Sequence, residues 1–186
     1  MSKYKKINIF LDFDCVLNNF DREEKSRYEK IEFNKENVNN LYILLKYLER
    51  KYGDNCYKII LNTAWKMNTG IKLIGLCKLK AKASKDCDKE LDYIVNKFED
   101  VTPTYNFFNR NKEGGTYCCK SFEVLSYIAQ NYNNEDNDLF LYLDDEKVEF
   151  EYINVIQYNT NIHKGLTFDD IRNIKNIIDK NILKTK

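Results

Sequence analysis

The stretch NIFLDFDCVLNN, from Asn8 to Asn19, places two carboxylates at the end of an apolar run. Three apolar residues precede Asp12, and Asp14 follows after one further apolar residue. A short apolar run of this kind is typical of a buried strand. Burying an ionised carboxylate is costly unless a cation or a metal ion compensates the charge. The stretch therefore predicts a strand that delivers acids to a polar site.

Short apolar runs alternate with helical patterns along the rest of the chain. Strands are predicted at residues 7–12, 58–63, 100–102, 139–143 and 153–158. Helices are predicted after the N-cap candidate Asn34 and over residues 91–98, 122–132 and 171–182. The last helix follows a capping box of Thr167 and Asp170. The pattern of residues 66–86 is weak and fits a helix, a loop or both, and 104–119 are predicted to form a loop. This alternation predicts an α/β fold with three layers, in which helices cover both faces of a Rossmann-like parallel sheet.

Polar side chains follow three of the predicted strands. Asp12 and Asp14 come after the first, Thr63 ends the second, and Asp144 and Asp145 end the LFLYL strand. The carboxyl ends of parallel strands meet at one edge of a sheet, where ligands bind. Oxygen ligands of this kind suit Mg²⁺, which also binds phosphate oxygens.

Lys120 begins the helix that precedes the LFLYL strand, so its ammonium can reach the same edge. Carboxylates, a hard metal ion, an ammonium and a hydroxyl together form a plausible site for phosphoryl transfer. Trp65 is interpreted as a packing residue and His163 as a loop residue.

The amino-acid composition excludes several classes of protein and site. Lysine and arginine number 30 and aspartate and glutamate 29, which argues against a protein that coats nucleic acid but leaves room for a local basic patch. The six cysteines form no C-x-x-C pair and there is one histidine, so no zinc site is expected. With one proline and six glycines no linker is evident, and a single domain over residues 1–186 is expected.

No stretch approaches the roughly 20 apolar residues of a membrane helix. The first residues, MSKYKKINIF, have too short an apolar run for a signal peptide. We therefore expect a cytoplasmic protein with reduced thiols and no membrane partner.

At four fragments the sequence resembles the haloacid dehalogenase (HAD) superfamily of phosphatases. They are DFDCV (Asp12–Val16), LNT (Leu61–Thr63), Lys120 and YLDDE (Tyr142–Glu146). More specifically, the chain is similar to the HAD domain of Swiss army knife RNA repair proteins. The fragments that carry this likeness are D-x-D-x-V-L-N (12–18), T-A-W-K (63–66), V-T-P (101–103), K-x-F-E-V (120–124), the pair Asp144-Asp145 and G-L-T (165–167).

The resemblance implies a Mg²⁺-dependent phosphatase that hydrolyses phosphomonoesters through an aspartyl-phosphate. Asp12 is expected to be the nucleophile. The other oxygen of Asp12, the backbone carbonyl of Asp14, and Asp144 and Asp145 are expected to bind Mg²⁺. The Asp14 side chain is expected to protonate the leaving oxygen and then to activate water.

The resemblance also implies contacts with the phosphorylated substrate. Lys120 is expected to neutralise charge on the nucleophile and the phosphoryl group. Thr63, Lys66 and Asn18 are the expected substrate contacts. Two positions depart from the family: Cys15 stands where many members have glycine, and Thr63 with Ala64 replaces a serine-rich stretch.

The spacing of the motifs leaves no room for a full cap domain, so a capless or minimally capped site is expected. An open site suits a large substrate such as a nucleic-acid end. Lysines 66, 72, 78, 80, 82 and 85 form a basic segment for a phosphate backbone, or simply a solvated face. The alternatives are a non-catalytic HAD-fold module in nucleic-acid repair, a small-metabolite phosphatase and a phosphomutase. The sequence does not indicate a 3′ or 5′ preference or an oligomeric state.

Overall fold

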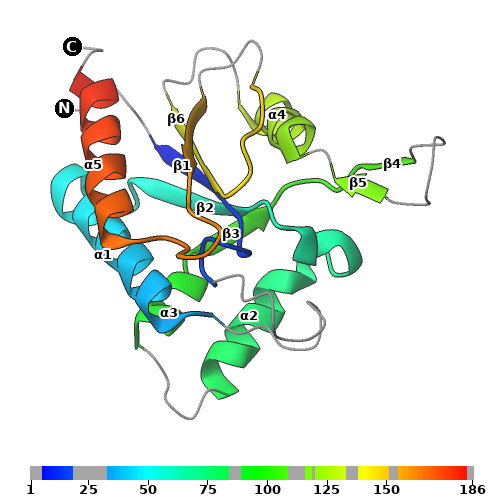
Figure 1. Cartoon of the computed structure of the whole chain (residues 1–186), viewed down its shortest axis with the longest axis horizontal. Coiled ribbons are helices and arrows are strands. Elements are labelled where there is room, and N and C mark those ends of the chain that lie inside the picture. Colours follow the sequence, from blue (N-terminus) through cyan, green and yellow to red (C-terminus); the bar gives the residue numbers. More distant parts are fainter. Residues whose placement is uncertain are drawn as a thin grey trace.

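The centre of the protein is a five-stranded parallel sheet with the order β3-β2-β1-β6-β7. This computed structural model describes residues 6–18, 33–83, 89–108, 116–118, 120–132, 138–150 and 155–183. The central strand β1 (Ile7–Leu11) lies between β2 (Tyr57–Leu61) and β6 (Leu139–Asp144). The outer strands are β3 (Phe98–Val101) and β7 (Val155–Asn159) (Figure 1). The prediction of a parallel α/β sheet is confirmed.

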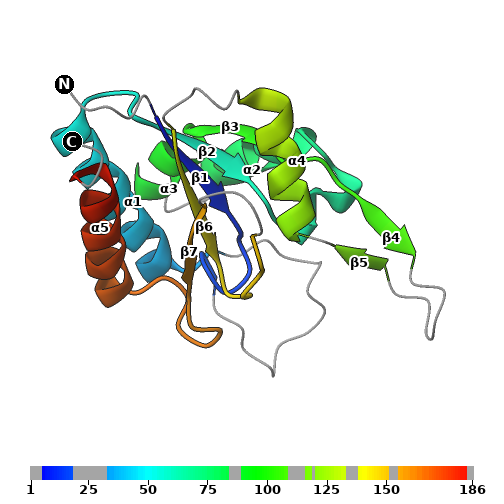
Figure 2. The same cartoon turned by 90° about the horizontal axis from the view of Figure 1, so that it is seen from above.

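Helices cover both faces of this sheet. Figures 1 and 2 show α1 and α5 on one side and α4 on the other. The helices are α1 (Lys35–Tyr52), the 3₁₀ helix η1 (Ala64–Asn68), α2 (Lys72–Ala83), α3 (Lys89–Val95), α4 (Lys120–Asn131) and α5 (Phe168–Leu183). Among the described residues, no helix is both long and apolar enough to cross a membrane.

Alternating side chains of β1 supply two separate cores. Ile7, Ile9 and Leu11 are buried in the cluster that includes apolar residues of α1, α2, α3 and α5. Phe10 faces the other way, into a smaller cluster with Val124 of α4. Because successive strand residues point to opposite faces, a strand buried on both faces reads as a continuous apolar run.

The predicted starts of α1 and α5 have the expected caps. The Asn34 side chain accepts hydrogen bonds from the backbone of Glu36 and Asn37. Thr167 and Asp170 bond reciprocally, as a capping box requires.

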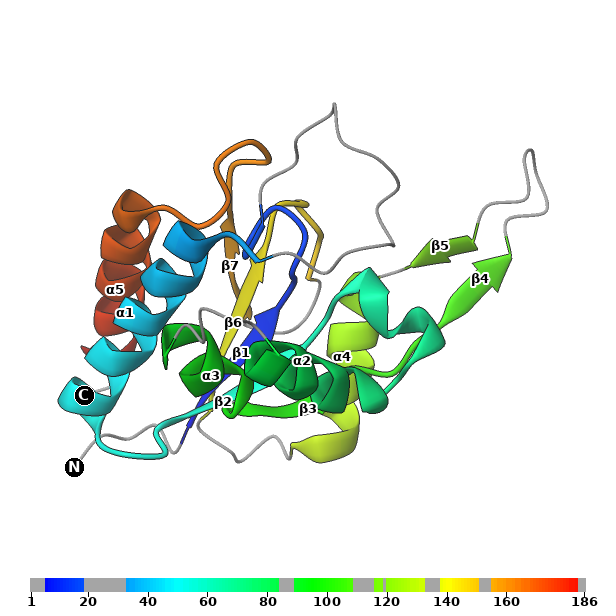
Figure 3. The same cartoon turned by 90° about the horizontal axis from the view of Figure 1, so that it is seen from below.

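One prediction was wrong: residues 104–119 do not form a plain loop. They contain an antiparallel ribbon of β4 (Asn106–Phe108) and β5 (Thr116–Cys118). Strands of three residues are too short to produce a readable two-residue period. Figure 3 shows the ribbon extending away from the sheet. In the described part of the interval 66–119, the other elements are η1, α2, α3 and β3.

Glu49, near the end of α1, gives the fold a testable dependence on pH. Burial acts to raise its pKa, but hydrogen bonds from Tyr93, Lys46 and Lys97 outweigh burial and lower the pKa to about 2. Because the folded chain has the lower pKa, this group stabilises the fold above about pH 4.5, and the contribution disappears as the pH falls toward about 2. Glu49→Gln is therefore expected to lower the urea midpoint of unfolding at pH 7. Below about pH 4.5, the midpoint of this variant should decrease less with falling pH than that of the wild type. Asp54→Asn, at an exposed turn residue, is the control and should keep the decline of the wild type.

Candidate active site

The residues that follow the strands lie side by side because the backbone hydrogen bonds continue past the strand ends. The backbone nitrogen of Asp12 donates to Leu143 at 3.0 Å, and that of Asn62 donates to Leu11 at 2.9 Å. The same pattern links Thr102 to the end of β2 at 2.9 Å. One edge of the sheet therefore collects the residues after β1, β2, β3 and β6.

The ammonium of Lys120 lies between two buried carboxylates at this edge. Its Nζ is 2.6 Å from Oδ2 of Asp12 and 2.9 and 2.8 Å from the two oxygens of Asp144. The side chains of Asp12 and Asp144 are 3% and 0% exposed, and that of Lys120 is 10% exposed. Residues far apart in the sequence thus form one charged group on three different elements.

Burial and mutual repulsion set the protonation of this group. Burial, followed by the charge of Asp144, raises the pKa of Asp12 to about 6, while Lys120 and a hydrogen bond from Thr63 oppose the rise. Burial also raises the pKa of Asp144 against the opposing charge of Lys120. For Lys120 burial acts to lower the pKa, but the two carboxylates outweigh burial and raise it. Lys120 therefore remains a cation over the physiological range.

Asp145 completes a group of acids that can hold a metal ion. Oxygen atoms of Asp12, Asp144 and Asp145 all lie within 4.8 Å of one another. Asp144 is oriented by the hydroxyl of Tyr142 at 2.6 Å and by the backbone nitrogen of Glu146 at 2.9 Å. A set of carboxylate oxygens without nitrogen or sulfur ligands fits a hard divalent cation.

Asp14, two residues after Asp12 in the loop that follows β1, is held by two donors. The Trp65 Nε1 donates to one oxygen at 2.9 Å, and the Asn18 side chain donates to the other at 3.1 Å. Asn18 also accepts a bond from the backbone of Cys15, so it shapes the loop that carries Asp14. Sequence reasoning assigned Trp65 to packing alone. The T-A-W-K fragment was the available signal, but it did not reveal a hydrogen bond that spans 51 residues.

The loop after β1 makes a tight turn at Cys15. This residue has a φ of +56°, in the left-handed region that favours glycine. Its carbonyl accepts a hydrogen bond from the Thr160 hydroxyl at 2.6 Å. Burial, together with the charges of Asp145 and Asp14, raises the pKa of the Cys15 thiol to about 12. The thiol is therefore protonated and acts as a small packing group.

Thr63 and Lys66 lie at the end of β2, in different surroundings. Thr63 is buried next to Asp12, and its hydroxyl oxygen accepts a 3.4 Å bond from the backbone of Trp65. The ammonium of Lys66 is instead fully buried and forms a 2.5 Å ion pair with Glu123. This placement differs from the expected substrate contact, because the side chain turns inward to meet a buried carboxylate.

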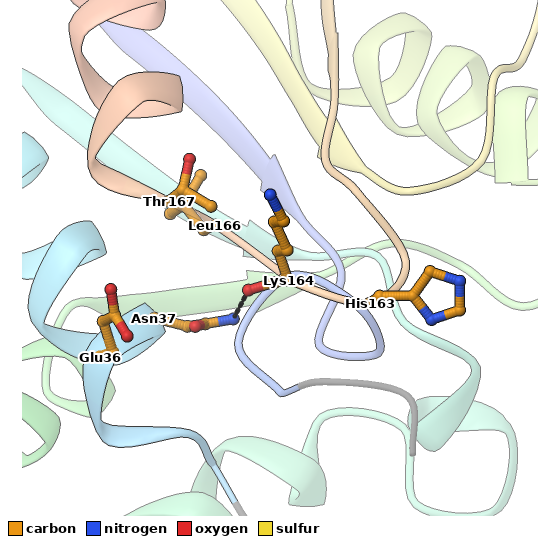
Figure 4. A pocket seen from close by; sticks show the side chains of 6 residues that line it. All are labelled: Glu36, Asn37, His163, Lys164, Leu166 and Thr167. Carbon is orange, nitrogen blue, oxygen red and sulfur yellow. Dashed lines mark hydrogen bonds between the residues drawn. The ribbon is translucent and has the colours of Figure 1, made fainter. Parts of the chain in front are cut away.

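A polar hollow of about 230 Å³ lies beside the loop after β1 (residues 12–18, here called the Asp12 loop). It is lined by Glu36, Asn37, His163, Lys164, Leu166 and Thr167. Figure 4 shows Asn37 and Lys164 linked by a hydrogen bond, and the Asn37 side chain also donates to Val16 of the loop at 3.1 Å. His163 and Lys164 are exposed in the segment between β7 and α5. The rim of the sheet edge thus carries an exposed cation outside the charged group.

Comparison with known proteins agrees with this geometry. A family model described as the HAD domain in Swiss Army Knife RNA repair proteins matches residues 8–171. The chain belongs to this family. The matched range includes the acids, Lys120, four complete strands of the sheet and all of β1 except Ile7. Searches of curated proteins and of solved structures gave no match.

Removing the cation of the HAD site should destabilise the fold. In Lys120→Met, the carboxylates of Asp12 and Asp144 lose their buried partner, and the free energy of unfolding is expected to fall by about 3 kcal/mol. Lys58→Met removes a partly exposed lysine near Asp100, and should cost less than about 1 kcal/mol. Urea unfolding in the presence of a chelator measures both. Equal losses in the two variants would contradict the buried pairing.

Proposed function

We propose that this HAD domain is a Mg²⁺-dependent phosphatase that hydrolyses phosphomonoesters through an aspartyl-phosphate on Asp12. The observation that supports this function best is the position of Lys120, whose ammonium contacts both Asp12 and Asp144 at the carboxyl edge of the sheet. A phosphoryl group next to Asp12 would meet a preplaced positive charge. Preplaced charge is usually the largest single contribution to phosphoryl transfer.

In the first step, an oxygen of Asp12 attacks phosphorus and forms a P–O bond, while the bond from phosphorus to the leaving oxygen breaks. Asp14 gives its proton to that oxygen, so the alcohol leaves neutral. In the second step, Asp14 takes a proton from water, and the resulting hydroxide attacks the phosphorus and releases Asp12 and inorganic phosphate. The bonds from Trp65 and Asn18 keep the Asp14 carboxyl group in place for both steps.

Lys120 and Thr63 act on the phosphoryl group and its acceptor. Lys120 favours the ionised form of Asp12 and neutralises charge on the phosphoryl oxygens. The hydroxyl of Thr63 lies next to Asp12 and can donate to one of those oxygens. Lys120 begins the helix α4 and Thr63 lies two residues after strand β2, so little reorganisation is needed when the substrate binds.

Asp12, Asp144, Asp145 and the backbone carbonyl of Asp14 would hold Mg²⁺. The three carboxylates have the spacing and the donor type for such an ion. When bound, the ion would neutralise charge on the phosphoryl group.

We propose a nucleic-acid end as the substrate. The matching family is described from RNA repair proteins, and the described residues include no separate cap domain over the site. The segment after β7 presents Lys164 on the same side of the sheet as the Asp12 loop (Figure 4). An exposed lysine near a site that has no separate cap domain among the described residues suits a phosphate backbone that extends beyond the reacting group.

The proposed nucleophile can be tested with p-nitrophenyl phosphate. Asp12→Asn is expected to lower kcat by at least about 10³-fold, because an amide cannot form the phosphoenzyme. Activity of the wild type should require Mg²⁺ and disappear with chelator. Asp138→Asn, the same substitution at the beginning of β6 and the opposite edge, is the control and should retain activity. An active Asp12→Asn variant, or wild-type turnover in chelator, would refute the mechanism.

The proposed substrate class depends on Lys164. Lys164→Ala is expected to lower kcat/KM about three- to tenfold for 3′- or 5′-phosphorylated oligonucleotides, because one backbone phosphate loses its cation. The variant should turn over p-nitrophenyl phosphate like the wild type, since that ester does not reach the rim. Comparison of the two oligonucleotides also defines the preferred end. Turnover confined to small metabolites would refute this class.

A further inference from the structure

Lys66 and Glu123 form an ion pair that the proposed reaction does not use. Their side chains are both 0% exposed, and Nζ lies 2.5 Å from Oε2. Lys66 belongs to η1 after β2, whereas Glu123 belongs to the first turn of α4. The pair therefore joins two elements that are separated by 57 residues in the chain.

A buried ion pair is stable only when further hydrogen bonds satisfy both partners. The Lys66 ammonium also donates to the side chains of Asn62, at 3.1 Å, and Thr102. The second carboxylate oxygen of Glu123 accepts a 3.2 Å bond from the backbone of Tyr105. The pair thus ties α4 to the ends of both β2 and β3. Such contacts are directional, unlike apolar packing, and hold one arrangement of the three elements.

Glu123 lies three residues after Lys120, so both project from the first turn of α4. That turn has two charged attachments. Lys120 connects it to Asp12 and Asp144, and Glu123 connects it to Lys66. A shift of the turn by one ångström would move the Lys120 ammonium by a similar distance.

We propose that Lys66 and Glu123 are positioning residues, whose ion pair places the ammonium of Lys120 against Asp12 and Asp144. This inference rests on the proposed phosphatase function. The pair acts only through Lys120 and has no contact with the substrate. It explains why a lysine stands next to the site and yet points into the interior.

The kinetic test uses Glu123→Gln, which keeps the shape of the side chain but removes its charge. With p-nitrophenyl phosphate, we expect kcat to fall about 10- to 100-fold, because a small displacement of a catalytic group costs this much. KM should change less than about threefold. In the Lys120→Met background, the same substitution should change the remaining rate less than about twofold, because its effect passes through Lys120. If Glu123→Gln lowers kcat by the same factor in the Lys120→Met background as in the wild type, the proposal is overturned.

Two further variants separate positioning from loss of stability. Lys66→Met/Glu123→Gln removes both charges, so no buried charge is left unpaired, and it should still show the loss of kcat. Asp179→Asn removes the charge and one of the two acceptor oxygens that bind Tyr47, Tyr52 and Lys51, and so weakens the contacts of α5 with α1. It is the control for destabilisation and should retain the wild-type kcat below its unfolding temperature. An equal loss of kcat in Asp179→Asn would overturn the proposal.

A readout without catalysis keeps this inference separate from the proposed function. The ammonium signal of Lys120 in ¹⁵N NMR can be assigned by its absence in Lys120→Met. We expect this signal to shift or broaden in Glu123→Gln and to stay unchanged in Asp179→Asn. An unchanged signal in Glu123→Gln would overturn the positioning role. An inactive wild-type chain would refute the phosphatase function, while the NMR comparison still decides the role of the pair.

Discussion

Two buried carboxylates share one ammonium at the end of the central strand, and the organisation of the site depends on this compensation. Without Lys120, the charges of Asp12 and Asp144 would face each other inside the protein, since no other lysine or arginine of the described residues forms an ion pair with them. The cost of burying such charges is several kilocalories per mole for each ion. Their compensation needs three separate elements in fixed positions, so the site restricts how the sheet and α4 can be arranged.

A parallel sheet meets this requirement because all its strands end at the same edge. The central position of β1 places its carboxyl end between those of β2 and β6. Asp12 after β1 and Asp144 at the end of β6 therefore become neighbours, and Thr63 after β2 lies next to Asp12. The buried pair of Lys66 and Glu123 belongs to the same arrangement, since it joins α4 to the ends of β2 and β3.

The loop after β1 has to turn sharply within a few residues and still present Asp14 beside Asp12. The left-handed conformation of Cys15 makes that turn, and Asn18 and Thr160 hold it. A residue other than glycine is unfavourable in this conformation. The strain is compatible with the fold because Thr160 and Trp65, from distant parts of the chain, also donate hydrogen bonds to this loop.

The sequence by itself determined the five strands of the sheet, the helices α1, α3, α4 and α5, and the candidate residues Asp12, Asp14, Lys120 and Asp144, but it left the segment of α2 undecided between helix and loop. These features depend on local patterns, such as apolar runs and polar residues at strand ends, which can be recognised without knowing which residues they contact in the fold. It also determined the caps of α1 and α5, because capping is a contact within one helical turn.

Only the tertiary structure decided the partners of the remaining side chains. It turned Lys66 inward to Glu123, gave Trp65 a hydrogen bond to Asp14, and paired β4 with β5. The reason is physical: whether a lysine faces solvent or a buried carboxylate depends on which strands are neighbours and on where α4 packs. The partners of Lys66 and Trp65 lie more than 50 positions away in the sequence, and no local pattern indicates them.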